Sequence, residues 1–174
     1  DLNRLSISEL NTLADTLFAE WMRRNNAEVR STTVEVLVAR GVLVVGDGYR
    51  AKNSELAEDG VPFARAADID GVVRVGSGDM LASSRVPAAG EKLSRELDVV
   101  VTTKGTVGRM AQVARGTEPV VYSPQLSYWR IRDRAALDPH VLYRWMRSRA
   151  FREQLDRYAG QTDMAPYVNL QDQR

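Results

Sequence analysis

The stretch Asp98–Ala114, DVVVTTKGTVGRMAQVA, decides the fold of this chain. Residues 98–103 are continuous, mostly β-branched and apolar, and they are bounded by Lys104-Gly105, which is typical of a β-strand. Thr106–Arg109 turns the chain back, and residues 110–114 return as a partner strand. The stretch therefore predicts an antiparallel pair of strands.

Short strand patterns with regular turn signals lie on both sides of this pair. Residues 34–40 are compatible with either a strand or a short helix. Several short strands of this kind indicate a curved, mainly antiparallel sheet that is partly barrel-like. The other predicted β segments are a strand at 42–45, an extended segment entered by the turn at 60–65, a hairpin over 68–78 around Asp70-Gly71, and strands at 119–122 and 126–131.

Helices are predicted mainly near the C-terminus. Asp138-Pro139 supplies an N-cap and a first-turn proline, and a second helix is predicted over 150–158 with Gly160 as its C-cap. A further helix is predicted near 91–97. The residues expected to face inward on the two C-terminal helices are Val141, Leu142, Trp145, Met146, Phe151, Leu155 and Tyr158. Their outer face carries Arg144, Arg147, Arg149, Arg152 and Arg157.

Residues 6–24 have the pattern of an amphipathic helix. Ser6 and Glu9 match a capping box, and apolar residues follow at helical spacing. This helix either packs on its own domain or forms one member of a helix–helix spacer whose partner lies outside the chain. Its apolar stripe consists of Leu10, Leu13, Ala14, Leu17, Phe18, Trp21 and Met22.

The composition narrows the class of protein. The 174 residues are 44% hydrophobic and 27% charged, with a mean hydropathy of -0.33, which fits one globular domain. No run approaches the roughly 20 apolar residues of a membrane span. The absence of cysteine and the single histidine exclude disulfide frameworks and Cys/His zinc sites. We expect a cytoplasmic location, and the ends of the sequence indicate a piece of a longer chain.

Charge is unevenly distributed along the chain. Residues 1–99 carry 12 basic and 16 acidic residues, a net charge of −4, whereas residues 100–174 carry 12 basic and 7 acidic residues, a net charge of +5. A basic excess in one half is typical of a surface that binds a polyanion. Most arginine-rich helices are simply solvated, so charge alone does not establish nucleic-acid binding.

No residue pattern predicts catalysis. Lys104–Arg109 contains two glycines and a lysine, but a Walker loop requires the lysine at its end, before Ser/Thr and a helix. This segment is either a plain β-hairpin or a DNA-contacting loop whose glycines let the backbone approach a phosphate. His140 has no nucleophile pattern around it and is expected at the surface. Asp68 and Asp70 fit turn chemistry better than acid–base catalysis.

A polar loop at 49–53 offers a second candidate for DNA contact. Tyr49 can pack on a sugar or phosphate, Arg50 can pair with guanine, and Asn53 can pair with adenine. Lys52 adds a positive charge. Because any surface loop can have this composition, the ordinary structural interpretation stays open at this point.

Taken in chain order, these segments resemble the target recognition domain of a type I restriction-modification specificity subunit. In that family, a helix with the pattern Leu-Ala-Asp-x-Leu-Phe-x-x-Trp precedes a Gly-Asp-Gly loop, a Gly-x-Pro-Phe-x-Arg segment, a strand that leads to Gly-Thr-Val-Gly, and a Ser-Pro-Gln turn. The match spans nearly the whole chain, and the series is specific where no single motif is. The segments that carry it are Leu13–Trp21, Gly46–Tyr49, Gly60–Arg65, Asp68-Ile69, Asp98–Thr103, Gly105–Gly108, Ser123–Gln125, Leu142-Tyr143, Gly160–Thr162 and Asn169-Leu170.

The resemblance implies a fold, a domain division and a function. It implies an α+β fold, with a curved, mainly antiparallel sheet and flanking helices, preceded by a long amphipathic spacer helix over 1–28. The target recognition domain then spans 29–174. Such a domain reads double-stranded DNA without catalysis and holds a methyltransferase subunit, with or without a restriction/translocase subunit, on half of a bipartite site. No cofactor is expected on this chain, because S-adenosylmethionine is expected on the partner methyltransferase.

Other interpretations remain beside this one. The family usually has two recognition domains and two spacer helices, whereas this chain has one of each. It is therefore either part of such a subunit or the recognition tail of a fused N6-adenine methyltransferase. From other classes, it is a protein-interaction module that docks a partner through the Phe18/Trp21 stripe, or an enzyme domain whose site the sequence does not reveal.

The predicted site is a set of loop residues that we expect to converge on one concave face, because they sit at the ends of different strands and helices. The residues predicted to contact DNA are Tyr49, Arg50, Lys52, Asn53, Lys104, Thr106, Arg109, Gln125, Gln161 and Thr162. The residues predicted to contact a partner helix are Leu10, Leu17, Phe18 and Trp21. No catalytic or metal-binding residue is predicted.

Overall fold

The structure, a computed structural model, describes residues 16–17, 20, 32–75, 78–159 and 166–174. The chain divides into two compact units, residues 1–32 and 33–174. In the first unit, four residues are described, of which 16, 17 and 20 are helical and 32 is not. The rest of the predicted 6–24 helix, including Leu10, Phe18 and Trp21, lies outside the described residues. The proposed boundary between a spacer helix and a recognition domain at residue 28 stays a prediction.

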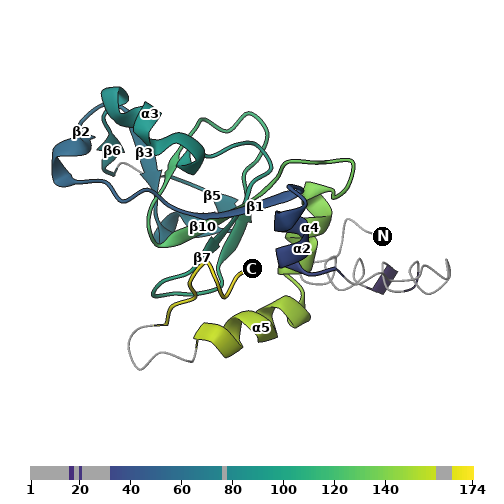
Figure 1. Cartoon of the computed structure of the whole chain (residues 1–174). Coiled ribbons are helices and arrows are strands. Elements are labelled where there is room, and N and C mark those ends of the chain that lie inside the picture. The colour runs from purple at the N-terminus through teal and green to yellow at the C-terminus, as the bar shows by residue number, and fades with distance from the viewer. Residues whose placement is uncertain (1–15, 18–19, 21–31, 76–77, 160–165) are drawn as a thin grey trace, which may run out of the picture. The chain divides into compact units, whose positions relative to one another are not determined.

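A four-stranded antiparallel sheet forms the centre of the second unit (Figure 1). In this sheet Asp47 pairs with Ser127, and Leu126 pairs with Thr102. The antiparallel pairing of residues 99–101 with residues 110–112 confirms the hairpin predicted over 98–114. In spatial order the strands are β1 (Leu43–Asp47), β10 (Leu126–Ile131), β7 (Val99–Thr102) and β8 (Met110–Gln112).

Both faces of this sheet are buried, which explains the continuous apolar run in β7. All four residues of β7 are buried. Val99 and Val101 pack in a core cluster with Trp129 on one face, whereas Val100 packs with Tyr128 on the other face. The alternation follows from the two-residue period of a strand.

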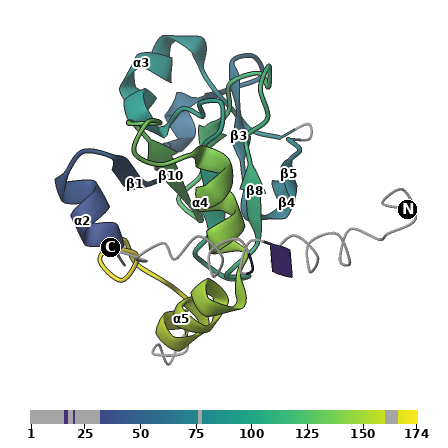
Figure 2. The ribbon, with the colours of Figure 1, turned by 90° about the vertical axis from the view of Figure 1, so that its right-hand side faces the viewer.

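Helices cover the Trp129 face of the sheet, and Figure 2 shows α4 lying in front of it. The predicted N-cap is confirmed, because the Asp138 carboxylate accepts a hydrogen bond from the backbone N–H of His140 at 2.7 Å. His140 itself is exposed, as expected. The helices of this layer are α4 (Pro139–Met146) and α5 (Arg149–Ala159), whose buried apolar residues are Leu142, Met146, Phe151 and Leu155.

Two residues predicted to face inward, Val141 and Tyr158, do not, and Trp145 does so only in part. Val141, Trp145 and Tyr158 are 48%, 39% and 39% exposed. Trp145 nevertheless contacts the core, because its ring centroid lies 4.9 Å from that of Phe151 and 6.4 Å from that of Trp129. The prediction of a wider apolar face on these helices was therefore wrong in part.

A second, smaller sheet packs on the other side of the molecule, together with a short hairpin. Its strand order is β2-β6-β3-β9, and β3 pairs with β9 in parallel. The hairpin predicted over 68–78 is confirmed around Asp70-Gly71, with Gly71 at φ 68° in the turn, but its paired strands cover only 69–73. These strands are β2 (Leu56–Ala57), β6 (Met80–Leu81), β3 (Val61–Ala64) and β9 (Val121–Tyr122), and the hairpin is β4 (Ile69–Asp70) with β5 (Val72–Val73). The predicted α+β, mainly antiparallel fold is confirmed, and the sheets stay open instead of closing into a barrel.

The structure settles the ambiguity at 34–40 and corrects the helix near 91–97. Residues 34–39 form helix α2 (Val34–Ala39), whose N-cap Thr33 accepts from the Val36 N–H at 3.2 Å. Residues 93–97 are not helical, because the Ser94 N–H donates to the Val120 carbonyl at 2.8 Å instead of to a helical partner. The remaining helical segments are α3 (Val86–Ala89) and the 3-10 turns η2 (Asn53–Glu55), η3 (Ala66–Asp68), η4 (Ser83–Arg85) and η5 (Gly90–Lys92).

Candidate nucleic-acid interface

The topology brings the predicted loops to one end of the central sheet. β1 ends at Asp47 and β7 ends at Thr102, and the residues paired with them, Ser127 and Leu126, begin β10. The loops 48–53, 103–109 and 123–125 therefore all leave from the same end, which we call the loop end. It carries eight of the ten predicted DNA-contacting residues, and the other two, Gln161 and Thr162, lie outside the described residues.

The loop end contains a hollow of about 270 Å³. Four segments that are far apart in the sequence line it, namely parts of 47–50, 103–104, 124–127 and 167–170, together with Lys92. Arg50 and Lys104 are the predicted site residues that the structure brings together in this hollow. Concave surfaces lined by loops on a rigid sheet are typical binding sites.

The charge in the hollow is predominantly positive. Its charged lining residues are Arg50, Lys92, Lys104 and Asp47. The Lys92 ammonium donates to Asp47 Oδ1 at 2.8 Å and to the Gly48 carbonyl at 3.0 Å, so the one carboxylate is neutralised. No hydrogen bond or ion pair joins Arg50 to any other described residue, and its charge remains available.

Lys104 is held beside an aromatic ring. Its Nζ lies 4.8 Å from the ring centroid of Tyr167, a cation–π contact that leaves the full positive charge on the lysine. The backbones of the two residues also form an isolated antiparallel bridge, and the Val168 N–H donates to the Thr103 carbonyl at 3.0 Å. The C-terminal segment therefore fixes where Lys104 lies.

A glycine is required where the chain leaves β1. A Cβ atom on Gly48 would lie 1.9 Å from the carbonyl oxygen of Ser123, far inside van der Waals contact. The Gly48 N–H donates to the Leu126 carbonyl at 3.1 Å, and the Tyr49 N–H donates to the Tyr122 carbonyl at 2.7 Å. The 48–53 loop is thereby tied to the 122–126 turn at the edge of the hollow.

Glu55 organises the 49–53 loop, and sequence reasoning missed it. Its Oε2 accepts from the Lys52 N–H at 3.0 Å and from the Tyr49 hydroxyl at 3.2 Å. The Lys52 N–H is the main cause of the lowered pKa of Glu55, while burial is the main cause of the raised pKa of Tyr49. Tyr49 therefore anchors the loop through its hydroxyl, whereas Arg50 and Asn53 are exposed. A glutamate three residues after Lys52 was only half of a capping-box signal, because lysine is not a capping residue type.

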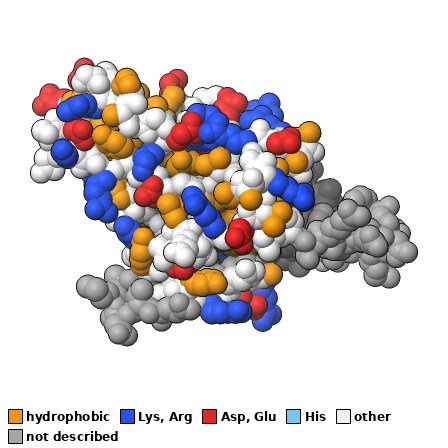
Figure 3. Space-filling model, in the orientation of Figure 1, with side chains coloured by type: hydrophobic (Ala, Val, Ile, Leu, Met, Phe, Trp, Pro, Cys, Tyr) orange, Lys and Arg blue, Asp and Glu red, His pale blue; other side chains and the backbone are white. Residues whose placement is uncertain are grey.

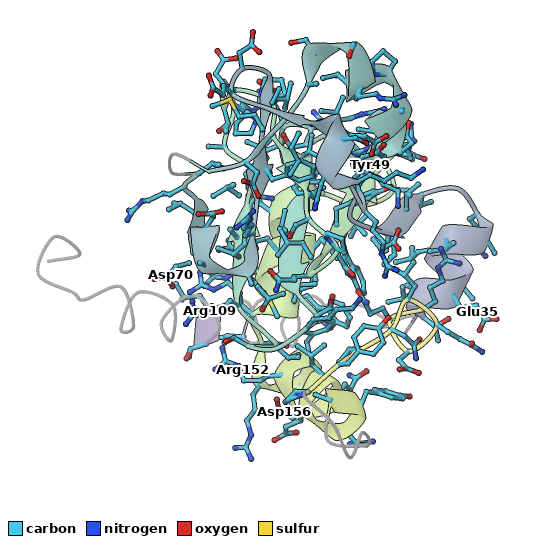
Figure 4. The ribbon with its side chains drawn as sticks, turned by 90° about the vertical axis from the view of Figure 1, so that its left-hand side faces the viewer. Glu35, Tyr49, Asp70, Arg109, Arg152 and Asp156 are labelled. Atoms are coloured by element: carbon cyan, nitrogen blue, oxygen red, sulfur yellow. The ribbon has the colours of Figure 1, made fainter. Side chains whose placement is uncertain are left out.

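Thr102 closes the 104–109 turn. Its hydroxyl donates to the Thr106 carbonyl and accepts from the Arg109 N–H. Arg109 is exposed, but it lies at the start of β8, on the opposite edge of the sheet from β1, roughly 14 Å away at the usual strand spacing. Figure 4 shows Arg109 far from Tyr49 and on the side of Asp70. The predicted convergence is therefore partial, because Arg109 shares the loop end with Arg50 but does not line the hollow.

Gln125 contributes its backbone to the turn and leaves its side chain exposed. Its carbonyl accepts from the Thr103 N–H at 2.8 Å and from the Thr103 hydroxyl at 3.2 Å. These bonds join the 123–125 turn to the end of β7. The amide side chain is free to contact a ligand beside the hollow.

The C-terminal segment 166–174 is the part of the site that the sequence did not predict. It contributes Tyr167, Val168 and Leu170 to the hollow. Gln173, 7% exposed, anchors it: Oε1 accepts from Trp129 Nε1 at 3.2 Å, and Nε2 donates to Ser127 Oγ at 3.0 Å. No local pattern signals this docking, because the partners lie more than forty residues away in the chain.

Basic side chains also occur elsewhere on the surface. The space-filling view shows Lys and Arg mixed with acidic side chains on the face that Figure 1 presents (Figure 3). On α5, Arg149 is paired with Glu153 at 2.6 Å. At the C-cap of α4, Arg147 lies 5.4 Å from the ring centroid of Tyr143. The described residues contain no group of three or more acidic or histidine side chains placed to hold a metal ion, and none of their helices has the length and apolarity to cross a membrane.

Comparisons with known proteins identify the fold. No protein-family model matches the chain, and no curated protein matches its sequence. Among solved structures, a chain from a study of the complex assembly and conformational transition of the type I R-M system matches with a TM-score of 0.53 and 16% identity, over 96% of this chain and 40% of that chain. The HsdS subunit from Thermoanaerobacter tengcongensis matches with a TM-score of 0.52 and 20% identity, over 77% of this chain and 33% of that chain.

The chain thus spans less than half the length of either structure. At this level of identity the likeness establishes the fold. The chain has the fold of type I restriction-modification specificity subunits, which confirms the resemblance indicated by its sequence motifs.

Proposed function

We propose that the chain is a sequence-specific DNA recognition module that positions a methyltransferase complex on half of a bipartite site and is not itself catalytic. The observation that carries this proposal is the loop end of the central sheet, where three loops surround a hollow in which positive charge exceeds negative charge. The likeness to the HsdS subunit supports the same function.

The loop end carries side chains suited to both kinds of DNA contact, to phosphates and to base edges. Phosphate contacts fix the position of a protein on the duplex, whereas contacts to base edges carry the sequence information. Lys104 is placed for the first task. The exposed side chains of Asn53, Arg109 and Gln125 are of the types that form paired hydrogen bonds with adenine or guanine. Because these side chains project from loops on a rigid sheet, loop changes can alter the sequence read without changing the fold.

The partners follow from the same proposal. Double-stranded DNA is the ligand, and a methyltransferase subunit supplies the chemistry and binds S-adenosylmethionine. A complete complex adds a restriction/translocase subunit. We assign the contact with the partner helix to the stripe of Leu10, Leu17, Phe18 and Trp21, of which Leu17 is described and is 56% exposed.

Selection from a random pool of duplexes tests this function. The 174-residue chain is expected to enrich one short sequence. A triple variant with alanine at 53, 109 and 125 is expected to retain duplexes with a flattened sequence preference. Arg115→Ala, an exposed arginine in the loop beyond the other end of β8, serves as the matched control. Retention of sequences at their frequencies in the pool, or methyl transfer from S-adenosylmethionine by the chain alone, would contradict the proposal.

A further inference from the structure

We propose that the hollow at the loop end binds a phosphate group, held between Arg50 and Lys104. The chemistry is that of a phosphate oxygen facing a guanidinium and an ammonium, and its source is either the DNA backbone or a free phosphate ion. The DNA source rests on the proposed function, whereas binding of a phosphate ion does not.

The net positive charge of the lining favours an anion as the ligand of the hollow. Asp47 and Lys92 neutralise each other through their 2.8 Å contact, which leaves Arg50 and Lys104 as the uncompensated charges in the lining. Two cations that share one hollow repel each other, and a bound anion removes that repulsion. A guanidinium beside an ammonium is the pairing that proteins use for phosphates.

The position of Lys104 is fixed before any ligand arrives. Its backbone pairs with Tyr167, the Gly105 N–H donates to the Pro166 carbonyl at 3.1 Å, and its ammonium lies against the Tyr167 ring. A cation that is already ordered loses less side-chain entropy on binding. The ring holds the charge in place without neutralising it, as a carboxylate would.

The size and lining of the hollow fit a phosphate with its water. A volume of about 270 Å³ exceeds by several fold the roughly 30 Å³ that one water molecule occupies in the liquid. Ser127 is one of the lining residues, and its Oγ accepts from Gln173 Nε2 at 3.0 Å, so its own hydrogen is left to donate. At the rim, Gly48 presents no side chain.

Arg50 has a different role in this site from the one suggested by the sequence. A side chain that holds a phosphate positions the duplex and carries no sequence information directly. Arg50 therefore acts with Lys104 as a positioning residue and does not read guanine, as the sequence analysis had allowed. Base reading falls to exposed residues around the hollow, such as Gln125.

Titration with inorganic phosphate tests the site without DNA. Amide NMR spectra of the 174-residue chain, at constant ionic strength, are expected to show saturable shifts at Gly48, Thr103 and Gly105. Arg50→Ala and Lys104→Ala are each expected to weaken this binding at least tenfold, whereas Arg115→Ala leaves it unchanged. Spectra that match the wild type away from the hollow establish that the variants are folded. Absence of saturable shifts, or an affinity equal to that of the wild type in either of these two variants, would overturn the proposal.

Duplex binding across salt concentrations identifies the source of the phosphate. Each single variant is expected to weaken all duplexes alike and to lower the salt slope by at most about one, since the other cation still faces the same phosphate. The double variant is also expected to lower it by about one, because both residues act on one phosphate. Phosphate binding without duplex binding would support the phosphate site and refute the proposed function. Duplex binding with unchanged salt slopes in the variants would refute the phosphate site and would not affect the proposed DNA recognition.

Discussion

Asp98 and Arg130 form a buried ion pair that ties the central sheet to the segment before β7. The side chains are 1% and 4% exposed, and two parallel bonds join them, from Nε at 2.8 Å and from Nη2 at 2.7 Å. The Tyr122 hydroxyl donates to the same carboxylate at 2.8 Å. Burial and, second, the charge of Asp98 raise the pKa of Tyr122 well above its usual value, so this phenol stays protonated.

Asp98→Ala is expected to lower the free energy of unfolding by about 3 kcal/mol, because it removes the buried carboxylate that accepts from Nε and Nη2 of Arg130 and from the Tyr122 hydroxyl. Glu91 still pairs with Nη1 of Arg130 at 2.8 Å. Urea denaturation of the 174-residue chain measures this change. Asp70→Ala removes an exposed aspartate and is expected to stay within about 0.5 kcal/mol of the wild type. Equal losses in the two variants would show that the buried pair does not stabilise the fold.

Glu55 is expected to make stability depend on pH. Its folded-state pKa lies below the reference value of 4.5, mainly because the Lys52 N–H donates to the carboxylate. A depressed pKa contributes stability that is fully present above the unfolded-state pKa and is lost as the pH falls through the folded-state pKa. Glu55→Gln should therefore destabilise the chain near pH 7, and the difference from the wild type should shrink as the pH falls below about 4.5. Thermal denaturation from pH 7 downward measures it, and a difference that grows toward acid pH would refute this role.

At the scale of elements, strands and capped helices were predictable, and segments with distant partners were not. The β-branched run at 98–103 and the Asp138-Pro139 cap specify their structures locally. The sequence pattern at 91–97 is typical of a helix, but in the structure the Ser94 N–H donates to the Val120 carbonyl instead. The C-terminal segment 166–174 has no local pattern at all, because its contacts with Thr103 and Trp129 exist only in the folded chain.

Gln173→Ala tests how this C-terminal segment is held. The substitution leaves the Trp129 indole N–H and the Ser127 hydroxyl without their partner, and it is expected to cost about 1–3 kcal/mol. Hydrogen exchange should then speed up at the Val168 and Gly105 amides, which bond across the two segments. Gln171→Ala, at an exposed position, is the matched control. Unchanged exchange at both amides in Gln173→Ala would show that other contacts hold the segment.

At the scale of the whole molecule, the site was predictable in part. The series of loop motifs gave the correct set of segments, and the antiparallel register places 48–53, 103–109 and 123–125 at one end of the sheet. The sequence did not predict that Arg109 lies across the sheet from Arg50, since strand order is a property of the fold. It also did not predict Lys92 or Tyr167, which reach the hollow from segments without any motif.

Hydrogen exchange of the 174-residue chain, with and without the duplex enriched from the random pool, tests most directly the claim that the loop end recognises DNA. The duplex is expected to slow exchange in the segments 47–50, 103–106, 124–127 and 167–170 and to leave the outer face of α5 unchanged. Protection confined to α4 and α5, or no protection in the 33–174 unit despite binding, would contradict it.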